Sequence, residues 1–259
     1  MKVKFLAVFF IALTFSNAVF AAEKNTQVEI WNSAEGLKRL ERSQFKNDFY
    51  QLVNFFQPQE NPLYCSVATA TIISNALDYG KIASQKNSET RKPQTAGGGI
   101  IEYRLYSQST FFNDKTEKVK KRSIVEYREP KAGSTTYDPG FSLGDFATML
   151  SKGHNLKAKV IYANKNDEES IEKFRQVLKK NLIENKFFVA VNFDGQVLEK
   201  TTRGHLSPVV AYDEESDSAL VMDVALHKNQ WYWAKVPKLF EAMNTKDDDI
   251  YRGYLVIGR

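Results

Sequence analysis

The feature that most constrains the fold of this chain is a run of small and apolar residues that begins at its only cysteine, Cys65. Residues 55–80 read FFQPQENPLYCSVATATIISNALDYG, and the apolar positions after the cysteine recur at three- and four-residue spacing. That spacing is typical of a helix with a buried face. Gly80 can adopt the left-handed conformation that ends a helix. The stretch therefore predicts a buried helix with Cys65 in its first turn and a stop at Gly80.

A thiol in the first turn of a helix is placed to act as a nucleophile. Unpaired backbone N–H groups and the positive end of the helix dipole both favour thiolate over thiol. Gln59, six residues upstream, offers the neutral donor that an oxyanion needs. The alternatives are that Cys65 is a small buried hydrophobe and that Gln59 is an ordinary surface glutamine.

The amino terminus has the pattern of a secretory signal peptide, residues 1–21. Lys2 and Lys4 precede an apolar run at residues 5–15, which small residues follow. The run is too short for a membrane span, which needs roughly 20 apolar residues. We expect cleavage after Ala21 and export across the inner membrane to the bacterial periplasm; the alternative is an uncleaved anchor. A lone cysteine cannot form an internal disulfide, so the exported thiol is free to react.

Residues 22–259 have the composition of one folded domain. Hydrophobic residues make up 42% of the sequence, which argues against disorder. The formal net charge is +5, and loss of the two signal-peptide lysines lowers it to +3. This balance is too even to indicate a nucleic-acid partner. We expect no membrane contact after signal cleavage, and the sequence does not decide between a monomer and a homodimer.

Local patterns place most helices before most strands. Ser33 and Ser142 are expected helix caps, and Gly153 is the expected stop of the helix that follows Ser142. Residues 81–99 are rich in polar residues and glycine and predict a surface loop. The expected helical segments are residues 23–54, 142–152 and 167–185, and the expected strands are residues 158–162 and 187–193. We therefore expect helices first and a sheet afterwards.

Residues 205–224, HLSPVVAYDEESDSALVMDV, have the pattern of a β-hairpin with an acidic turn. Folding the segment about Glu214 or Glu215 places His205 opposite Asp223 or one pair away from it. A His–Asp pair presented to a cysteine at a helix start can turn the thiol into an acyl-transfer nucleophile. The alternatives are a core histidine and a strand-end acid that binds backbone.

Several motifs resemble the phytochelatin synthase family in its short form: FQPQENPLYC, ISNAL, GHLSPVVAYDEESDSALVMDV, WAKVPKLFEAMNT and YRGYLV. The likeness covers residues 50–256. The resemblance implies an α+β, papain-like cysteine protease fold for the domain. An N-terminal helical lobe would carry Cys65, and a C-terminal antiparallel β-sheet lobe would carry His205 and Asp223. It also implies that Gln59 belongs to the oxyanion hole.

Two departures from the family pattern affect these expectations. Ser66 replaces a glycine after the cysteine, a change that a helix tolerates. Leu226 replaces an arginine in the DVALHKNQW segment, whereas the family's lysine is kept as Lys228. The loss of this arginine bears on recognition of a substrate carboxylate. Arg203, Lys228 and Arg252 are the candidate substrate-binding cations.

The resemblance also implies a reaction with glutathione. The Cys65 thiolate would attack the Cys–Gly amide, and water or a second glutathione would take the γ-glutamylcysteinyl group. We expect no tightly bound cofactor and no metal site on the protein; a heavy-metal ion such as Cd or Zn would enter as a thiolate complex of the acceptor glutathione. The rival interpretations are a general secreted papain-like peptidase and a catalytically silent glutathione-binding protein.

Overall fold

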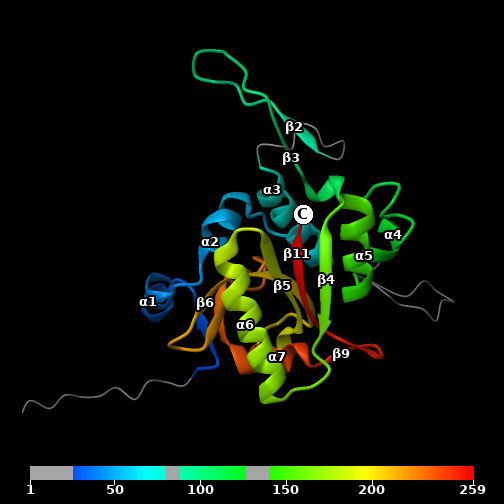
Figure 1. Ribbon diagram of the computed structural model, residues 1–259. Helices are drawn as coiled ribbons and strands as arrows, with labels where there is room; N and C mark the ends of the chain where they lie inside the picture. The colour runs from blue at the N-terminus through cyan, green and yellow to red at the C-terminus, as the bar shows by residue number, and fades with distance from the viewer. Residues whose placement is uncertain (1–25, 80–87, 127–139) are drawn as a thin grey trace, which may run out of the picture.

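The computed structural model describes residues 26–79, 88–126 and 140–259. Within them lies one seven-stranded antiparallel sheet, in the order β1-β8-β7-β6-β5-β11-β4 (Figure 1). The predicted signal peptide and Gly80 lie outside the described residues. Helices and an antiparallel sheet confirm the α+β class, and the finer assignment to a papain-like fold stays a prediction. The strands are β1 (Val28–Ile30), β4 (Lys157–Tyr162), β5 (Phe187–Asp194), β6 (Gly204–Asp213), β7 (Ser218–Val221), β8 (Tyr232–Lys235) and β11 (Gly253–Gly258).

Both faces of the sheet are covered by helices, because side chains along each strand point alternately to opposite faces. On β5, Phe188 and Ala190 join the apolar cluster that contains helices α3 (Cys65–Asp78) and α5 (Leu143–His154). Val189 and Val191 join the cluster on the other face, with α6 (Glu168–Glu184) and α7 (Val236–Met243). Figure 1 shows α6 and α7 in front of the sheet. The result is a three-layer arrangement with a core on each side of the sheet.

Helix α3 runs through the first of these cores, as its sequence predicts. Its apolar side chains from Val67 to Ile73 are buried, and Thr69 donates its hydroxyl to the carbonyl of Leu206 on β6 at 3.2 Å. Tyr64 precedes the helix and makes no side-chain cap. The first backbone N–H groups of α3 are therefore not taken by a cap, and Cys65 is the first helical residue.

The segment before α3 contains the expected helices and, in addition, one strand that the sequence pattern does not indicate. Ser33 accepts a hydrogen bond from the backbone of Gly36 and caps α1 (Ala34–Arg42), as expected. The helices α2 (Asn47–Leu52) and η1 (Val53–Phe55) follow. The purely helical expectation for residues 23–54 is wrong at β1, which pairs with β8. That pairing is a long-range contact, so local helical spacing does not reveal it.

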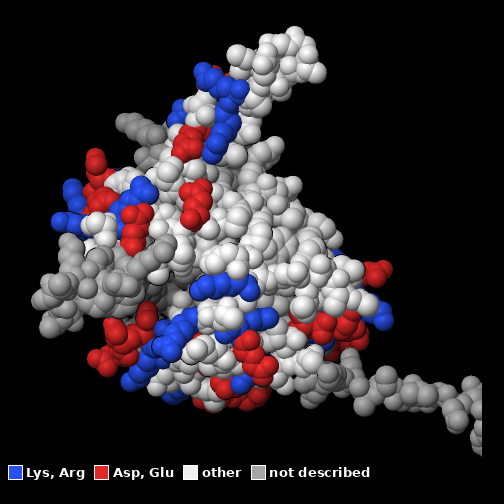
Figure 2. All heavy atoms as spheres, turned by 180° about the vertical axis from the view of Figure 1, so that it is seen from behind, with Lys and Arg blue, Asp and Glu red and all other residues white. Residues whose placement is uncertain are grey.

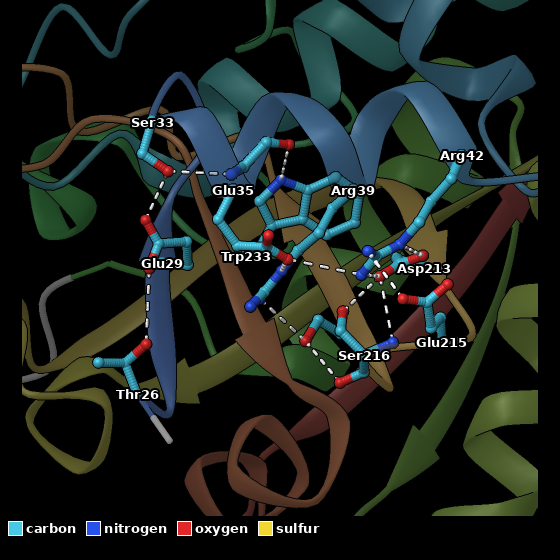
Figure 3. A network of polar contacts seen from close by, with 12 residues as sticks. Thr26, Glu29, Ser33, Glu35, Arg39, Arg42, Asp213, Glu215, Ser216 and Trp233 are labelled. Carbon is cyan, nitrogen blue, oxygen red and sulfur yellow. Dashed lines mark hydrogen bonds and ion pairs between the residues drawn. The ribbon is translucent and has the colours of Figure 1, made fainter. Parts of the chain in front are cut away.

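Helix α1 is fastened to the β6–β7 turn by a polar network (Figure 3). Arg42 donates to both carboxylate oxygens of Asp213, at 3.0 and 2.6 Å. Arg39 donates to the Ser218 hydroxyl, and the indole N–H of Trp233 donates to the carbonyl of Gly36 at 3.0 Å. These contacts hold the end of β6 at Asp213, whereas His205 lies at the other end of the strand.

The remaining elements follow the sequence closely, with two corrections. Ser142 caps α5, but the helix ends at His154 rather than at Gly153, because Asn155 adopts the left-handed conformation. Asp167 caps α6. The predicted loop at residues 81–99 contains β2 (Glu89–Arg91), which forms a projecting hairpin with β3 (Tyr103–Leu105) (Figure 1). The short elements η3 (Gln108–Thr110), α4 (Arg122–Val125), η4 (Gly195–Leu198), β9 (Lys246–Asp247) and β10 (Ile250–Tyr251) complete the described chain.

The order of helices before sheet is also wrong in part. β1 precedes the helices of the described residues, and β4 precedes α6 and α7, so helices and strands interleave along this part of the chain. Among the described helices, none is both long and apolar enough to cross a membrane. On the face of the molecule turned away in Figure 1, basic and acidic side chains are interspersed, and many basic ones gather in its lower half (Figure 2).

Candidate active site

Cys65 lies where the start of α3 meets the start of β6. The thiol is partly buried, and it lies beside His205 and the backbone N–H groups of Leu206 and Ser66, which lower its pKa. Leu206 and His205 are neighbours on β6, whereas Ser66 is the next residue of α3. The helix start and the strand start therefore supply the partners of the sulfur together.

His205 and Asp223 form a buried pair beside the thiol. The Nε2 atom of His205 lies 2.8 Å from Oδ1 of Asp223, and both side chains are almost fully buried. The predicted β6–β7 hairpin is confirmed, although its register shifts between Val209 and Ala211. Asp223 follows the last residue of β7 by two positions. Because Nε2 is bound to the carboxylate, only Nδ1 of the ring is left for the thiol.

The pKa values of Cys65 and His205 are shifted in the directions that favour an ion pair. Burial raises the pKa of the Cys65 thiol, but the hydrogen bond and charge of His205 and two backbone N–H groups lower it by more, so its pKa falls below the ordinary value. Burial lowers the pKa of His205, but Asp223 and Cys65 together raise it well above its ordinary value. A low thiol pKa and a high imidazole pKa favour thiolate and imidazolium at neutral pH.

Asp223 is held by donors that the sequence analysis missed. Its Oδ1 accepts from the backbone N–H of Ala225 at 2.8 Å, and its Oδ2 accepts from Nδ2 of Asn229 at 3.1 Å. Ser207 places its hydroxyl 3.1 Å from Nε2 of His205. Asn229 lies six residues after Asp223 in a polar segment with no regular spacing, so no pattern marks it. These contacts fix the carboxylate in front of the imidazole.

Gln59 lies in the same cleft as Cys65 and is buried. Its backbone N–H donates to the carbonyl of Val224 at 2.9 Å, which ties the Gln59 loop to the loop that follows Asp223. Its side-chain Nε2 donates to the carbonyl of Asn61 at 2.9 Å, and its Oε1 has no hydrogen-bond partner within the described residues. An amide nitrogen carries two hydrogens, so one is left for a ligand in the cleft.

The cleft has a volume of about 790 Å³ and brings all three candidate cations to its wall. Arg203 and Lys228 are exposed, whereas Arg252 is buried. Arg252 donates to the hydroxyl of Thr245 and to Oδ1 of Asp247, each at 3.1 Å, and to the carbonyl of Lys246. Arg252 is thus a fixed cation, and Arg203 and Lys228 are cations that water reaches.

The two departures from the family pattern lie in different surroundings. Ser66 is buried and lines the cleft, within α3, so the helix does accept it. Leu226 is half exposed and is not among the described residues that line the cleft. Its neighbour Ala225 and nearby Lys228 do line the cleft, so position 226 lies at the cleft's edge.

Comparison with known proteins identifies the family. A model of the family described as phytochelatin synthase matches residues 23–254. The chain belongs to the phytochelatin synthase family. The family expected from the motifs is therefore confirmed.

Curated relatives from plants and yeast share this match. The glutathione gamma-glutamylcysteinyltransferase of Schizosaccharomyces pombe is 35% identical over 225 residues, which cover 85% of this chain and 45% of the relative. Glutathione gamma-glutamylcysteinyltransferase 2 of Arabidopsis thaliana is 26% identical over 213 residues, covering 82% of this chain and 40% of the relative. Glutathione gamma-glutamylcysteinyltransferase 1 of Lotus japonicus is 27% identical over 214 residues, covering 82% and 36%. The chain spans less than half the length of these phytochelatin synthase relatives.

Within residues 26–79, 88–126 and 140–259, no three or more histidine, cysteine, aspartate or glutamate side chains form a group suited to a metal ion. The acidic residues of the cleft wall, Asp145, Asp247, Asp248 and Asp249, form no such group with Cys65 or His205.

Proposed function

We propose that this protein cleaves the Cys–Gly amide of glutathione and holds the γ-glutamylcysteinyl group as a thioester on Cys65. The observation that carries the proposal is the contact of a partly buried thiol with a buried His205–Asp223 pair, at the wall of a cleft lined by three cations. The names of the phytochelatin synthase relatives support glutathione as the substrate.

The reaction follows from the roles of these side chains. The Cys65 thiolate attacks the carbonyl carbon of the Cys–Gly amide, and the carbonyl oxygen becomes an oxyanion that the free amide hydrogen of Gln59 stabilises. His205 donates its Nδ1 proton to the glycine nitrogen as the C–N bond breaks. Neutral His205 then takes a proton from water or from the free amine of a second glutathione as that nucleophile attacks the thioester carbonyl. The C–S bond breaks, the sulfur leaves as thiolate, and the thiolate–imidazolium pair is restored.

The charge of glutathione is suited to the cleft. At neutral pH the molecule carries two carboxylates and one ammonium group. Arg203, Lys228 and Arg252 provide positive charge for the carboxylates, and bonds between a guanidinium and a carboxylate are among the stronger hydrogen bonds in proteins. Asp247, Asp248 and Asp249 line the same cleft and provide negative charge for the ammonium group.

The proposal includes the acceptor and the place of action. A heavy-metal ion such as Cd or Zn enters as the thiolate complex of the acceptor glutathione, so the protein itself needs no metal ligands. The signal-peptide pattern of residues 1–21 supports export of the protein. The proposed substrate would then be glutathione that has also been exported.

A direct experiment tests the function. The purified protein is incubated with glutathione, with and without cadmium, and products are identified by mass. Release of glycine together with γ-glutamylcysteine or longer (γ-Glu-Cys)n-Gly peptides supports the proposal. Cleavage of unrelated peptides instead, or binding of glutathione without any product, would support one of the two rival interpretations.

Gln59→Ala is expected to lower kcat by roughly 10²-fold, the usual cost of losing one oxyanion donor. The KM for glutathione should change little, because the donor acts on the oxyanion rather than on the bound substrate. Steady-state kinetics of glycine release measure both constants. Gln196→Ala, at an exposed glutamine, is the matched control and should behave as the unmodified protein. An unchanged kcat for Gln59→Ala would place the donor elsewhere.

The unmodified protein is expected to hydrolyse glutathione more than it transfers the acyl group. An acceptor carboxylate that lacks a bidentate arginine loses roughly 1.5–3 kcal/mol of charge-assisted hydrogen bonding, whereas water needs no such partner. Leu226→Arg, at the edge of the cleft, should therefore raise the ratio of longer peptides to γ-glutamylcysteine. Leu226→Met, which adds length without charge, should leave that ratio unchanged.

Mass analysis with cadmium present measures the ratio. If the unmodified protein makes longer peptides as its main product, the argument from Leu226 is wrong. In that case Arg203, Lys228 or Arg252 already supplies the charge that the family's arginine provides.

A further inference from the structure

Lys200 is a cation beside the site that the mechanism above does not use. It follows η4 and precedes His205 by five residues. Its Nζ lies 4.4 Å from the centre of the Tyr232 ring, a distance at which an ammonium is attracted to the face of an aromatic ring. Burial lowers the pKa of Lys200, and the charges of Asp223 and Glu199 oppose this effect. Lys200 is therefore a partly buried ammonium within electrostatic reach of Asp223.

Tyr232 explains why the ammonium stays in this place. It lies on β8 opposite Val221, the last residue of β7, and Asp223 follows Val221 by two residues. Its side chain is fully buried, and its hydroxyl has no hydrogen-bond partner in the described part of the chain. Burial and the charge of Asp223 both raise the pKa of Tyr232. The ring thus provides a neutral surface next to Asp223 on which Lys200 rests.

Asp223 therefore has two cations in its neighbourhood: the His205 imidazolium, 2.8 Å from its carboxylate, and the Lys200 ammonium, which rests on the Tyr232 ring of the adjoining strand. A positive charge near a titrating pair disfavours the binding of a proton by that pair. We propose that Lys200 acts through Asp223 to make the His205 imidazolium a stronger proton donor. The proposal rests on the proposed function only in that the proton goes to the departing glycine nitrogen.

The effect is largest at the moment when the proton leaves. Once His205 is neutral, Asp223 is a buried carboxylate without its imidazolium, and an unpaired buried charge is costly. Lys200 remains charged, and its positive charge still attracts that carboxylate. The state after proton transfer is thereby stabilised relative to the state before it. Lys200 is not among the described residues that line the cleft, so it is a positioning residue for charge.

NMR titration of the histidine rings tests the proposal without any substrate. The chain has three histidines, His154, His205 and His227, so the ring signals are few. The titration is made in Cys65→Ala, because a coupled thiol would otherwise share the titration steps of His205. Adding Lys200→Met, or Lys200→Gln as a second neutral variant, is expected to raise the pKa of His205 by about 0.5–1 unit.

Two controls separate charge from shape and from net charge. Lys200→Arg keeps a cation that can rest on the Tyr232 ring, so the pKa of His205 should stay as in the parent. Lys186→Met, at an exposed lysine, makes the same change of net charge and should also leave that pKa unchanged. The cations that line the cleft, Arg203, Lys228 and Arg252, are unchanged in every variant.

The proposal is overturned if both neutral variants leave the pKa of His205 within about 0.2 unit of the parent. It is also overturned if Lys200→Arg shifts this pKa as much as Lys200→Met does, because the side chain would then act by packing. A separate assay of glycine release tests the proposed function. A shift of the His205 pKa in a protein that does not cleave glutathione would uphold the role of Lys200 and reject the substrate.

Discussion

Cys65→Ser is expected to reduce glycine release from glutathione by about 10⁴-fold or more, because the hydroxyl has no accessible anion at neutral pH. The pKa of the Cys65 thiol is lowered by His205 and two backbone N–H groups, and none of these contacts can ionise a serine comparably. Quantification of free glycine over time measures the loss. Serine is close in size to cysteine, so the melting temperature should stay within a few degrees of the unmodified protein.

Labelling with iodoacetamide gives the complementary result on the unmodified protein. A thiol with a lowered pKa is alkylated rapidly at neutral pH, whereas an ordinary thiol, with a pKa of about 8.5, reacts slowly. Rapid labelling at Cys65, with loss of glycine release in step with labelling, is expected. Substantial activity in Cys65→Ser, or full activity after complete alkylation, would contradict the assignment of the nucleophile.

Asp223→Asn is expected to lower the rate of glycine release by roughly 10⁴-fold, the loss seen when the acid of a catalytic triad is made neutral. The carboxylate accepts from three donors, namely the His205 ring, the Ala225 backbone and the Asn229 amide. An asparagine has one oxygen and one amide nitrogen, so its nitrogen would face one of these donors without a hydrogen bond. The imidazole would then lose its orientation.

The pH profile of Asp223→Asn should become narrower. The charge of Asp223 raises the pKa of His205, and His205 in turn lowers the pKa of Cys65. Activity rises as pH passes upward through the pKa of the thiol and falls as pH passes upward through the pKa of the imidazolium. Loss of the carboxylate charge lowers the second value, the pKa of the imidazolium. The alkaline limb of the profile should therefore move down in pH, and the profile narrows from that side.

A matched control is Asp114→Asn, at an exposed aspartate, which makes the same change of charge. It should keep both the rate and the pH profile of the unmodified protein. An Asp223→Asn variant with the unmodified profile would show that the carboxylate does not set the pKa of His205.

Local patterns in the sequence were enough to locate the nucleophile helix and the hairpin. The spacing of apolar residues after Cys65 and the two apolar runs on either side of Glu214 describe elements whose contacts lie mostly within a few residues of the chain. Cap residues add to this, because Ser33 and Ser142 act on backbone groups three residues away. Such features depend on short-range physics, and the structure contains them as predicted.

Elements that depend on long-range pairing were not predictable in this way. β1 has three residues and gains its strand conformation from β8, more than 200 positions later. The shift of register between Val209 and Ala211 depends on how β7 pairs with β6. The hairpin pattern predicted that His205 and Asp223 lie near each other, whereas the contact between their side chains is seen only in the structure.

The site shows the same division. The chemically typical residues Cys65, His205 and Asp223 could be named from their types and order, and Gln59 from its place six residues before the cysteine. Asn229 and Lys200 could not be named, because an amide and an ammonium in polar loops have no pattern of their own. Asn229 gains its role from its hydrogen bond to Asp223, and the role proposed for Lys200 depends on its place on the Tyr232 ring.

The hydrogen bond from the backbone N–H of Gln59 to the carbonyl of Val224 ties the loop of the amide donor to the loop that carries Asp223, so that neither loop can move without the other. Val224 directly follows Asp223, so any displacement of the carboxylate is transmitted along one peptide unit to the loop of the amide donor. Under the proposed function, proton transfer by His205 and oxyanion stabilisation by Gln59 would therefore depend on each other. The free-energy effects of substitutions in the Gln59 loop and in the Asp223 loop should therefore be non-additive, so a change in one loop constrains the residues tolerated in the other.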